Sequence, residues 1–159
     1  MPEEAILLLG SNAGRRVRRL RDAVRALSGA VRIERVSRIY GGEPSGREHQ
    51  PWFLNVAVRG YTDLDPEALL GYVKSIEAKA GRKAGGRWGP RALDIDIILM
   101  GNRVVREPHL AIPHPRMKDR RFCLVPVAEI APDVAVPPGG ETILDLLGEC
   151  RDPLEVILP

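Results

Sequence analysis

Two aspartates two positions apart, Asp94 and Asp96, have the spacing most suggestive of chemistry in this sequence. They lie in the run Leu-Asp-Ile-Asp-Ile, whose alternation of apolar and acidic residues predicts a β-strand. Residues two apart on a strand point to the same side, so the two carboxylates should lie together. Carboxylates this close repel each other unless a cation lies between them. Magnesium fits, because it prefers oxygen ligands and commonly binds one or two carboxylates plus substrate phosphates.

Arginines beside the acidic pair favour a metal site over the alternative interpretation, a solvated strand face that carries two acids. Arg87 and Arg91 flank Trp88-Gly89-Pro90 immediately upstream. A triphosphate needs such neighbours, because a metal bridges some of its oxygens and guanidinium groups take the remaining charge. The chain contains neither GxxxxGK[ST] nor GxGxxG. If ATP binds, arginines and magnesium must hold it in place of a glycine-rich cradle.

The two tryptophans and two phenylalanines lie beside polar or basic stretches: Trp52, Phe53, Trp88 and Phe122. Each could pack in the core or stack on a flat heterocycle. Asn55 should point to the same side of its strand as Phe53, and its amide offers both a donor and an acceptor to the edge of such a heterocycle. His114 lies between two prolines in a basic segment. There, a structural role and a phosphate-holding role both remain open.

The length and composition indicate one domain, residues 1–159. The use of cysteine indicates a reducing compartment, so we expect a cytoplasmic protein. The net charge is +3, and only four of the 24 basic residues are lysine. The planar guanidinium of arginine binds phosphate through paired hydrogen bonds, so this composition fits a phosphate-bearing partner. A solvent-exposed surface rich in arginine is the simpler explanation of the same composition. The two cysteines are far apart and have no zinc-ligand spacing. No apolar stretch is long enough to cross a membrane.

Hydrophobic periodicity predicts an alternation of strands and helices. The predicted strands are residues 5–9, 31–40 with one slip in period that suggests a bulge, 53–60, and 93–100 followed by a hairpin turn into 104–106. The predicted helices are residues 15–27, 66–80, 122–130 and 141–147, whereas 109–121 has no clear period. This order suggests an α+β, ferredoxin-like sandwich with long active-site loops. On the last long strand, Leu93, Ile95, Ile97 and Leu99 should face the core, with Ile98 and Met100 on the aspartate side.

Four segments resemble the 6-hydroxymethyl-7,8-dihydropterin pyrophosphokinase family of folate biosynthesis. They are LLLGSN (7–12), PWFLNVAV (51–58), RWGPRALDIDIILMG (87–101) and IPHPRMKDRRFCLVPVAEIAPD (112–133). The third segment is highly specific, and all four occur in the family's order. The resemblance implies a ferredoxin-like fold. It also implies transfer of pyrophosphate from ATP to the pterin hydroxymethyl group, with release of AMP.

The resemblance also implies roles for individual residues. Asp94 and Asp96 resemble the ligands of two magnesium ions, and Arg82 and Arg91 resemble catalytic arginines that contact phosphate. The implied pterin site comprises Gly42, Phe53, Asn55, Asp94 and Phe122. The implied ATP site comprises Arg82, Arg91, Ile97, Leu110, His114 and Arg120, with Trp88 on a mobile loop.

The chain departs from the family pattern in two loops. The family commonly has Thr-Pro or Thr-Glu-Pro where this chain has Gly41-Gly42-Glu43-Pro44, so a hydroxyl group is missing at Gly42. The loop that follows Gly81 is one residue shorter than in some relatives, and Lys83 stands where a second arginine would.

Two alternatives remain beside a stand-alone, monomeric enzyme that binds neither nucleic acid nor membrane. One is a homologue that binds pterin or nucleotide without turnover, which the two loop departures motivate. The other is a ferredoxin-like nucleic-acid-binding module. That module is disfavoured because paired acids on a central strand would repel phosphate and because no RNP-like strand is present.

Overall fold

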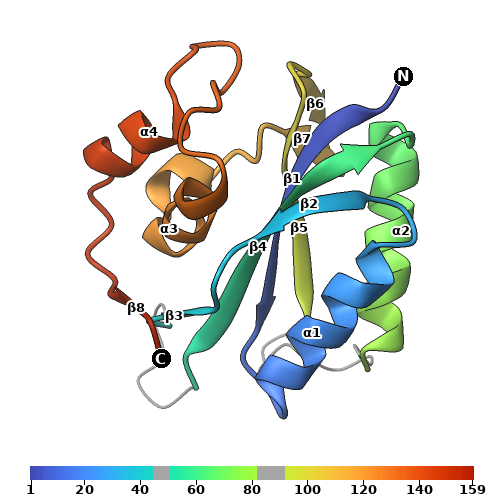
Figure 1. Cartoon of the computed structure of the whole chain (residues 1–159). Coiled ribbons are helices and arrows are strands. Elements are labelled where there is room, and N and C mark those ends of the chain that lie inside the picture. Colours follow the sequence, from blue (N-terminus) through green and yellow to red (C-terminus); the bar gives the residue numbers. More distant parts are fainter. Residues whose placement is uncertain (45–50, 82–91) are drawn as a thin grey trace.

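The computed structural model of the chain describes residues 1–44, 51–81 and 92–159. Its strands are β1 (Glu3–Ser11), β2 (Arg32–Val36), β3 (Tyr40–Gly42), β4 (Phe53–Thr62), β5 (Asp94–Met100), β6 (Val105–Glu107), β7 (Leu110–Ile112) and β8 (Val156–Ile157). Its helices are α1 (Arg16–Leu27), α2 (Pro66–Lys79), the 3-10 turn η1 (Met117–Asp119), α3 (Arg121–Ile130) and α4 (Ile143–Glu149). The predicted mixture of helices and antiparallel sheet is confirmed (Figure 1).

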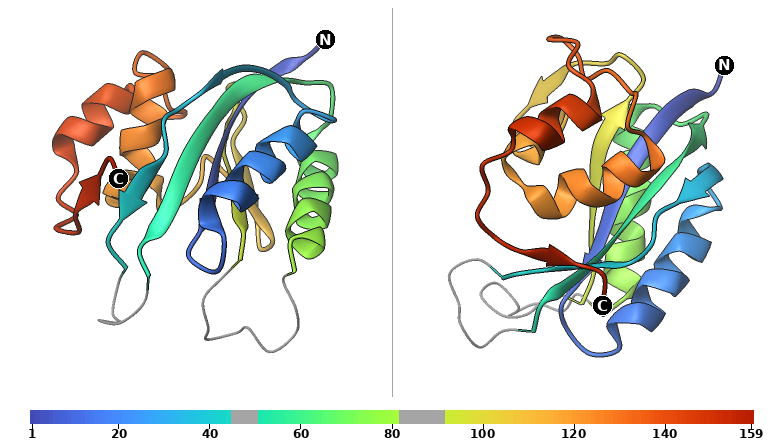
Figure 2. Two further views of the ribbon diagram at one scale, coloured as in Figure 1. Left: turned by 60° about the horizontal axis from the view of Figure 1, so that its bottom comes forward. Right: turned by 60° about the vertical axis from the view of Figure 1, so that its left-hand side comes forward.

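The main sheet has six strands in the order β5-β1-β4-β3-β8, with β2 paired to the other part of β4. Every neighbouring pair is antiparallel. In β1, residues 5–11 are all buried, because the strand lies in the middle of the sheet with helices on both faces (Figure 2). A strand covered on both sides must be apolar along its whole length, which explains the continuous run Ala-Ile-Leu-Leu-Leu.

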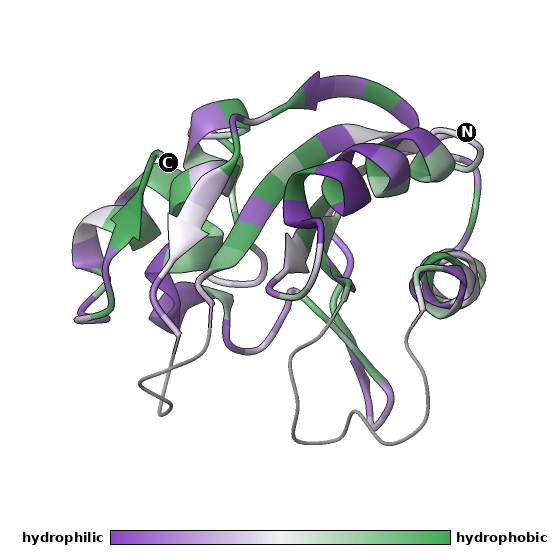
Figure 3. Cartoon of the chain, turned by 90° about the horizontal axis from the view of Figure 1, so that it is seen from below, coloured by the Kyte–Doolittle hydropathy of each residue, from purple (hydrophilic) through white to green (hydrophobic). Residues whose placement is uncertain are grey.

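Helices α1 and α2 cover one face of the sheet, and α3 and α4 cover the other (Figure 1). Alternate residues of the central strands serve the two cores. Leu7 and Leu9 pack in the cluster under α1 and α2, whereas Ile6 and Leu8 pack in the cluster under α3 and α4. On α1, hydrophilic and hydrophobic residues are interspersed, as expected of a helix with one buried side (Figure 3).

The start of α2 follows the sequence prediction. The Asp65 side chain accepts a hydrogen bond of 2.8 Å from the Ala68 amide, and Pro66 occupies the first helical position. Thr142 and Asp145 form a reciprocal capping box at the start of α4, with both hydrogen bonds at 3.1 Å. These caps satisfy amide groups that a helix cannot pair internally.

The single strand predicted over residues 31–40 is two strands, β2 and β3. Both pair with β4, and the predicted slip lies between Ile33 and Arg35. Between them, the Ser37 amide donates to the Ala57 carbonyl at 2.9 Å, but the Ala57 amide donates to the Ser37 hydroxyl, at 2.8 Å. A polar side chain thus replaces a backbone partner, which periodicity cannot reveal.

The prediction for the end of β5 was wrong for Leu99 and Met100. The register of β5 against β1 shifts so that Leu7 pairs with Ile97 and Ile6 with Leu99, which leaves Ile98 as an extra residue. After this bulge, Leu99 joins Ile98 in the cluster under α3 and α4, and Met100 lies in the opposite core.

The later elements were only partly predicted. The turn at Gly101 is present, but the strand after it pairs with β7 and not with β5. Strands β7 and β8 and the η1 turn were not predicted, because each is too short to show a period. Among the described residues, no helix is long and apolar enough to cross a membrane.

Candidate active site

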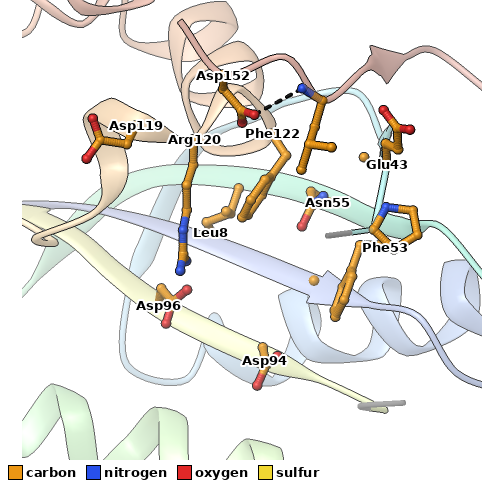
Figure 4. Close-up of a pocket in the computed structure, with 14 residues that line it drawn as sticks. Leu8, Glu43, Phe53, Asn55, Asp94, Asp96, Asp119, Arg120, Phe122 and Asp152 are labelled. Atoms are coloured by element: carbon orange, nitrogen blue, oxygen red, sulfur yellow. Dashed lines mark hydrogen bonds between the residues drawn. The ribbon is translucent and has the colours of Figure 1, made fainter. Parts of the chain in front are cut away.

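A cavity of about 460 Å³ opens on the α3 side of the sheet (Figure 4). Its lining combines carboxylates, one arginine and two aromatic rings: Leu8, Gly10, Gly42, Glu43, Pro44, Phe53, Asn55, Asp94, Asp96, Asp119, Arg120, Phe122, Asp152 and Leu154. The residues predicted for the pterin site all lie here. Residues from both halves of the sequence therefore line one cavity.

The strand register explains why the floor of the cavity is polar. Gly10 of β1 pairs with Asp94 on one side and Asn55 on the other, and directly paired residues point to the same face. A Cβ atom on Gly10 would lie 2.7 Å from Asn55 Oδ1, so a side chain there would collide with the amide. The absence of a side chain at Gly10 therefore leaves space between the side chains of Asn55 and Asp94.

The hydrogen bonding of the buried Asn55 side chain points to a ligand-binding role for this cavity. The residue is only 3% exposed, and its Nδ2 has no hydrogen-bond partner among the residues that the structure describes. A buried donor without a partner costs about 1–3 kcal/mol. Such an atom on the floor of a cavity is well explained if a ligand supplies the acceptor.

Two phenylalanines border the region around Asn55. Phe53 comes from the start of β4 and Phe122 from the first turn of α3, and in Figure 4 the labelled amide lies between them. Gly42 closes the same region, since a Cβ atom there would lie 3.0 Å from Phe122 Cβ and 3.2 Å from Asn55 Nδ2. Flat rings prefer offset stacking on aromatic faces, so this arrangement suits a heterocycle.

The two aspartates occupy the other end of the cavity, and Arg120 extends towards Asp96 (Figure 4). Burial raises the pKa of Asp96; the positive charge of His114 opposes this rise, and the negative charge of Asp94 adds to it. The Arg120 guanidinium carbon also lies 5.5 Å from the centre of the Phe122 ring. Arg120 therefore connects the acidic end with the aromatic end.

The β5 bulge helps to position His114 at this acidic end. The His114 amide donates a 3.0 Å hydrogen bond to the carbonyl of Ile98, the extra residue. The Arg116 amide donates to Nδ1 of the ring at 3.2 Å, which leaves the proton of the neutral ring on Nε2. Nε2 lies 4.0 Å from Asp96 Oδ2. Burial lowers the pKa of His114, against the opposing effect of the Asp96 charge.

The chemistry of the donor set fits magnesium. Asp94 and Asp96 offer carboxylate oxygens from the same face of one strand, and no group of three or more His, Cys, Asp or Glu residues within 1–44, 51–81 and 92–159 could hold a metal alone. The chain would therefore supply two carboxylates, and phosphate oxygens and water would complete the octahedron that Mg²⁺ demands.

Other predicted residues lie elsewhere or outside the described ranges. Arg82, Trp88 and Arg91 fall within 82–91, which the structure does not describe. Ile97 and Leu110 are buried in the core under α1 and α2, on the opposite face of the sheet from Asp96. Sequence reasoning overlooked seven lining residues: Leu8, Gly10, Glu43, Pro44, Asp119, Asp152 and Leu154.

An antiparallel α+β domain whose cavity joins a carboxylate pair to an aromatic slot is typical of an enzyme that handles phosphate next to a flat ring. The sequence model of the 7,8-dihydro-6-hydroxymethylpterin-pyrophosphokinase (HPPK) family matches residues 6–132. The chain therefore belongs to this family.

Two curated relatives match this chain over most of their own length. The chain is 43% identical over 147 residues to a 2-amino-4-hydroxy-6-hydroxymethyldihydropteridine pyrophosphokinase of Methylorubrum extorquens, covering 91% of this chain and 92% of the relative. It is 45% identical over 132 residues to the enzyme of that name from Bacillus subtilis, covering 82% and 79%.

A solved structure shares the fold. The Plasmodium falciparum wild-type HPPK-DHPS structure with pteroate aligns with a TM-score of 0.74 at 15% identity, covering 94% of this chain. This chain spans only 42% of that longer one. At such low identity, the likeness shows the fold alone.

Proposed function

We propose that this chain transfers the pyrophosphoryl group of ATP to the hydroxymethyl group of 6-hydroxymethyl-7,8-dihydropterin, releasing AMP, as a step of folate biosynthesis. Membership of the HPPK family supports this activity. The observation that links this activity to the cavity is the buried Nδ2 of Asn55 beside Phe53 and Phe122, which has no hydrogen-bond partner within 1–44, 51–81 and 92–159. This nitrogen can donate a hydrogen bond to an acceptor atom on the edge of a flat ring.

In this proposal, the pterin lies between Phe53 and Phe122 with its edge against Asn55. Gly42 contributes backbone groups beside the amide, since it has no side chain to occupy the slot. The hydroxymethyl group then points towards Asp94, which lines the same cavity. Stacking and amide recognition fix the ring, so the reacting oxygen is held in place before the chemistry begins.

The triphosphate lies at the end of the cavity that Asp94, Asp96 and Arg120 line. Arg120 and the Nε2–H of His114 bind its oxygens, and Arg82 and Arg91 are proposed to join them. The pterin hydroxyl oxygen forms a bond to the β-phosphorus and releases its proton to water, while the bond from that phosphorus to the bridging oxygen of AMP breaks and AMP leaves with the electron pair. The chain's contribution is mainly to orient the groups and offset charge, because phosphoryl transfer needs little covalent help.

Asp94 and Asp96 are proposed to hold two magnesium ions that bind with ATP. Bound there, the metal would neutralise charge on the triphosphate oxygens. Burial is the main cause of the raised pKa of Asp96, and the negative charge of Asp94 adds to it; a bound cation would offset that repulsion.

The finer structural proposals follow the same line. The order β5-β1-β4-β2, with α1 and α2 on one face, supports a ferredoxin-like sandwich. Ile97 directly follows Asp96 in β5, and Leu110 begins β7; both are proposed to border the adenine. We also propose a single-domain, monomeric, cytoplasmic enzyme.

The test is to mix the purified chain with ATP, Mg²⁺ and 6-hydroxymethyl-7,8-dihydropterin, and to separate the nucleotides by chromatography. AMP that requires both the pterin and Mg²⁺ would support the proposal. ADP would mean that the γ-phosphorus is attacked and would contradict it. Saturable binding of both substrates without any product would identify a homologue that binds but does not turn over.

A further inference from the structure

Residues 150–157, called here the 150–157 arm, run from the end of α4 past α3 to the edge strand β8 (Figures 1 and 2). The family match ends at residue 132, well before this arm. Two of its residues, Asp152 and Leu154, nevertheless line the same cavity as Asn55, Phe53 and Phe122. The arm therefore borders the pterin end of the site from outside the matched sequence.

One end of the arm is fastened to the start of α3. The Arg121 amide donates a 3.0 Å hydrogen bond to Asp152 Oδ2, so Asp152 caps a helix whose own preceding residue, Arg120, provides no side-chain cap. The Arg121 guanidinium donates in return to the carbonyls of Cys150 and Asp152, at 3.0 and 3.2 Å. Asp152 thereby helps to hold the helical turn that carries Arg120 and Phe122.

The other end of the arm is fastened to β3 and the residue after it. Gly41 pairs with Ile157 and Gly42 with Val156. The Glu43 amide donates to the carbonyl of Glu155, and the Glu155 amide donates to Glu43 Oε1, both at 2.9 Å. The arm therefore bridges two chain segments that border Asn55, β3 with Gly42 and α3 with Phe122.

Leu154 lies between these two attachments. Its amide donates a 3.0 Å hydrogen bond to Asp152 Oδ1, which fixes the turn and leaves the half-buried leucine on the cavity wall. The other residues that line this end include two aromatic rings and Pro44. An aliphatic side chain here completes an apolar rim around the polar amide.

We infer that the 150–157 arm is a wall of the pterin site, in which Leu154 contacts the bound ring system and Asp152 positions Phe122 against it. This inference rests on the proposed function. It assigns to the arm a part in pterin recognition, whereas a strap that only stabilises the fold would affect both substrates alike or neither. Leu154 acts on the pterin end alone, so ATP binding should not change when it is replaced. Loss of Asp152 should weaken pterin binding more than ATP binding, because the turn it caps also carries Arg120.

The test measures the Kd of the pterin, with a non-hydrolysable ATP analogue present, and separately the Kd of that analogue. Leu154→Ala removes apolar contact and should weaken pterin binding about fivefold to thirtyfold, with the analogue Kd within about twofold of wild type. Leu154→Met keeps an apolar side chain of similar size and should bind nearly as wild type. The matched control is Leu158→Ala, just beyond the arm and 52% exposed, which should change neither constant.

Asp152→Ala tests the positioning role. It should lower the melting temperature and weaken pterin binding more than analogue binding, since it removes the cap of the α3 turn that carries Phe122 together with Arg120. Equal weakening of pterin and analogue, or a Leu154→Ala variant indistinguishable from Leu158→Ala, would overturn the inference. Wild-type protein that binds no pterin would instead overturn the proposed function itself.

Discussion

The site has no space for a side chain at Gly42. The family commonly has threonine in this stretch, yet here a Cβ atom would lie 3.0 Å from Phe122 Cβ and 3.2 Å from Asn55 Nδ2. Phe122 Cβ is next to the backbone and cannot easily move aside. The close approach of α3 and β3 therefore depends on glycine at this position.

Restoring threonine should consequently harm the site. Overpacking typically costs about 1–3 kcal/mol, so we expect Gly42→Thr to weaken pterin binding by roughly tenfold or more in a calorimetric titration. Gly71→Thr is the matched control and should leave the Kd unchanged, because Gly71 is exposed on α2 and an added Cβ atom would have nothing within 4 Å. Tighter pterin binding by Gly42→Thr would show that the missing hydroxyl group is a defect.

Asp96 should be essential to turnover. Replacing its carboxylate with an amide removes half of the charge proposed to hold magnesium, so Asp96→Asn should lower kcat/KM about a thousandfold, or roughly 4 kcal/mol. Steady-state AMP formation measures this, with the exposed acid Asp22 of α1 changed to Asn as control. A loss of less than tenfold would remove Asp96 from the proposed metal site.

Phe122 should affect one substrate more than the other. Phe122→Ala removes a ring that borders Asn55, so pterin binding should weaken by about tenfold or more, while ATP binding changes far less. Separate titrations of the two ligands decide the matter. If both Kd values rise by the same factor, the stacking role is wrong.

At the scale of elements, α3 is tied to the sheet by Glu129. Its carboxylate accepts hydrogen bonds from the Tyr40 hydroxyl and from Arg38 Nε, the latter at 3.1 Å. Burial tends to raise the pKa of Glu129, but these hydrogen bonds outweigh that effect and the pKa is lowered. An acid with a lowered pKa stabilises the fold above its ordinary pKa, and this contribution is lost as the pH falls through the folded value.

Glu129→Gln should therefore change the pH dependence of stability. The free energy of unfolding of the variant should fall less than that of wild type as the pH drops from neutral to below about 4, the ordinary range of a glutamate. Urea titrations at several pH values measure this difference. Glu149→Gln, an exposed acid at the end of α4, should keep the wild-type slope; equal slopes for all three proteins would contradict the account.

Element positions were predicted best where periodicity was strong. The faces of β4 and the capped start of α2 follow directly from alternation and from Asp65-Pro66. The β5 bulge could not be predicted, because the extra residue Ile98 is apolar like its neighbours and only pairing with β1 reveals it. Yet this bulge turns the Ile98 carbonyl to His114 and so affects the site.

At the scale of the whole molecule, the sequence predicted the chemistry of the cavity better than its boundary. Asp94 and Asn55 were found from residue type and strand alternation, with the family resemblance to assign their roles. Asp152 and Leu154 were not, since they reach the cavity only through the hydrogen bonds that join α3, the arm and β3. No local pattern in the sequence encodes such a long-range connection.

The central claim is that one cavity brings the pterin hydroxyl group to the β-phosphorus of ATP. The most direct measurement is ³¹P NMR of the pterin product, purified after complete reaction with Mg²⁺ and ATP, together with the amount of AMP formed. The account predicts two mutually coupled phosphorus resonances on the pterin and one AMP per product molecule. A single phosphorus resonance accompanied by ADP would contradict it.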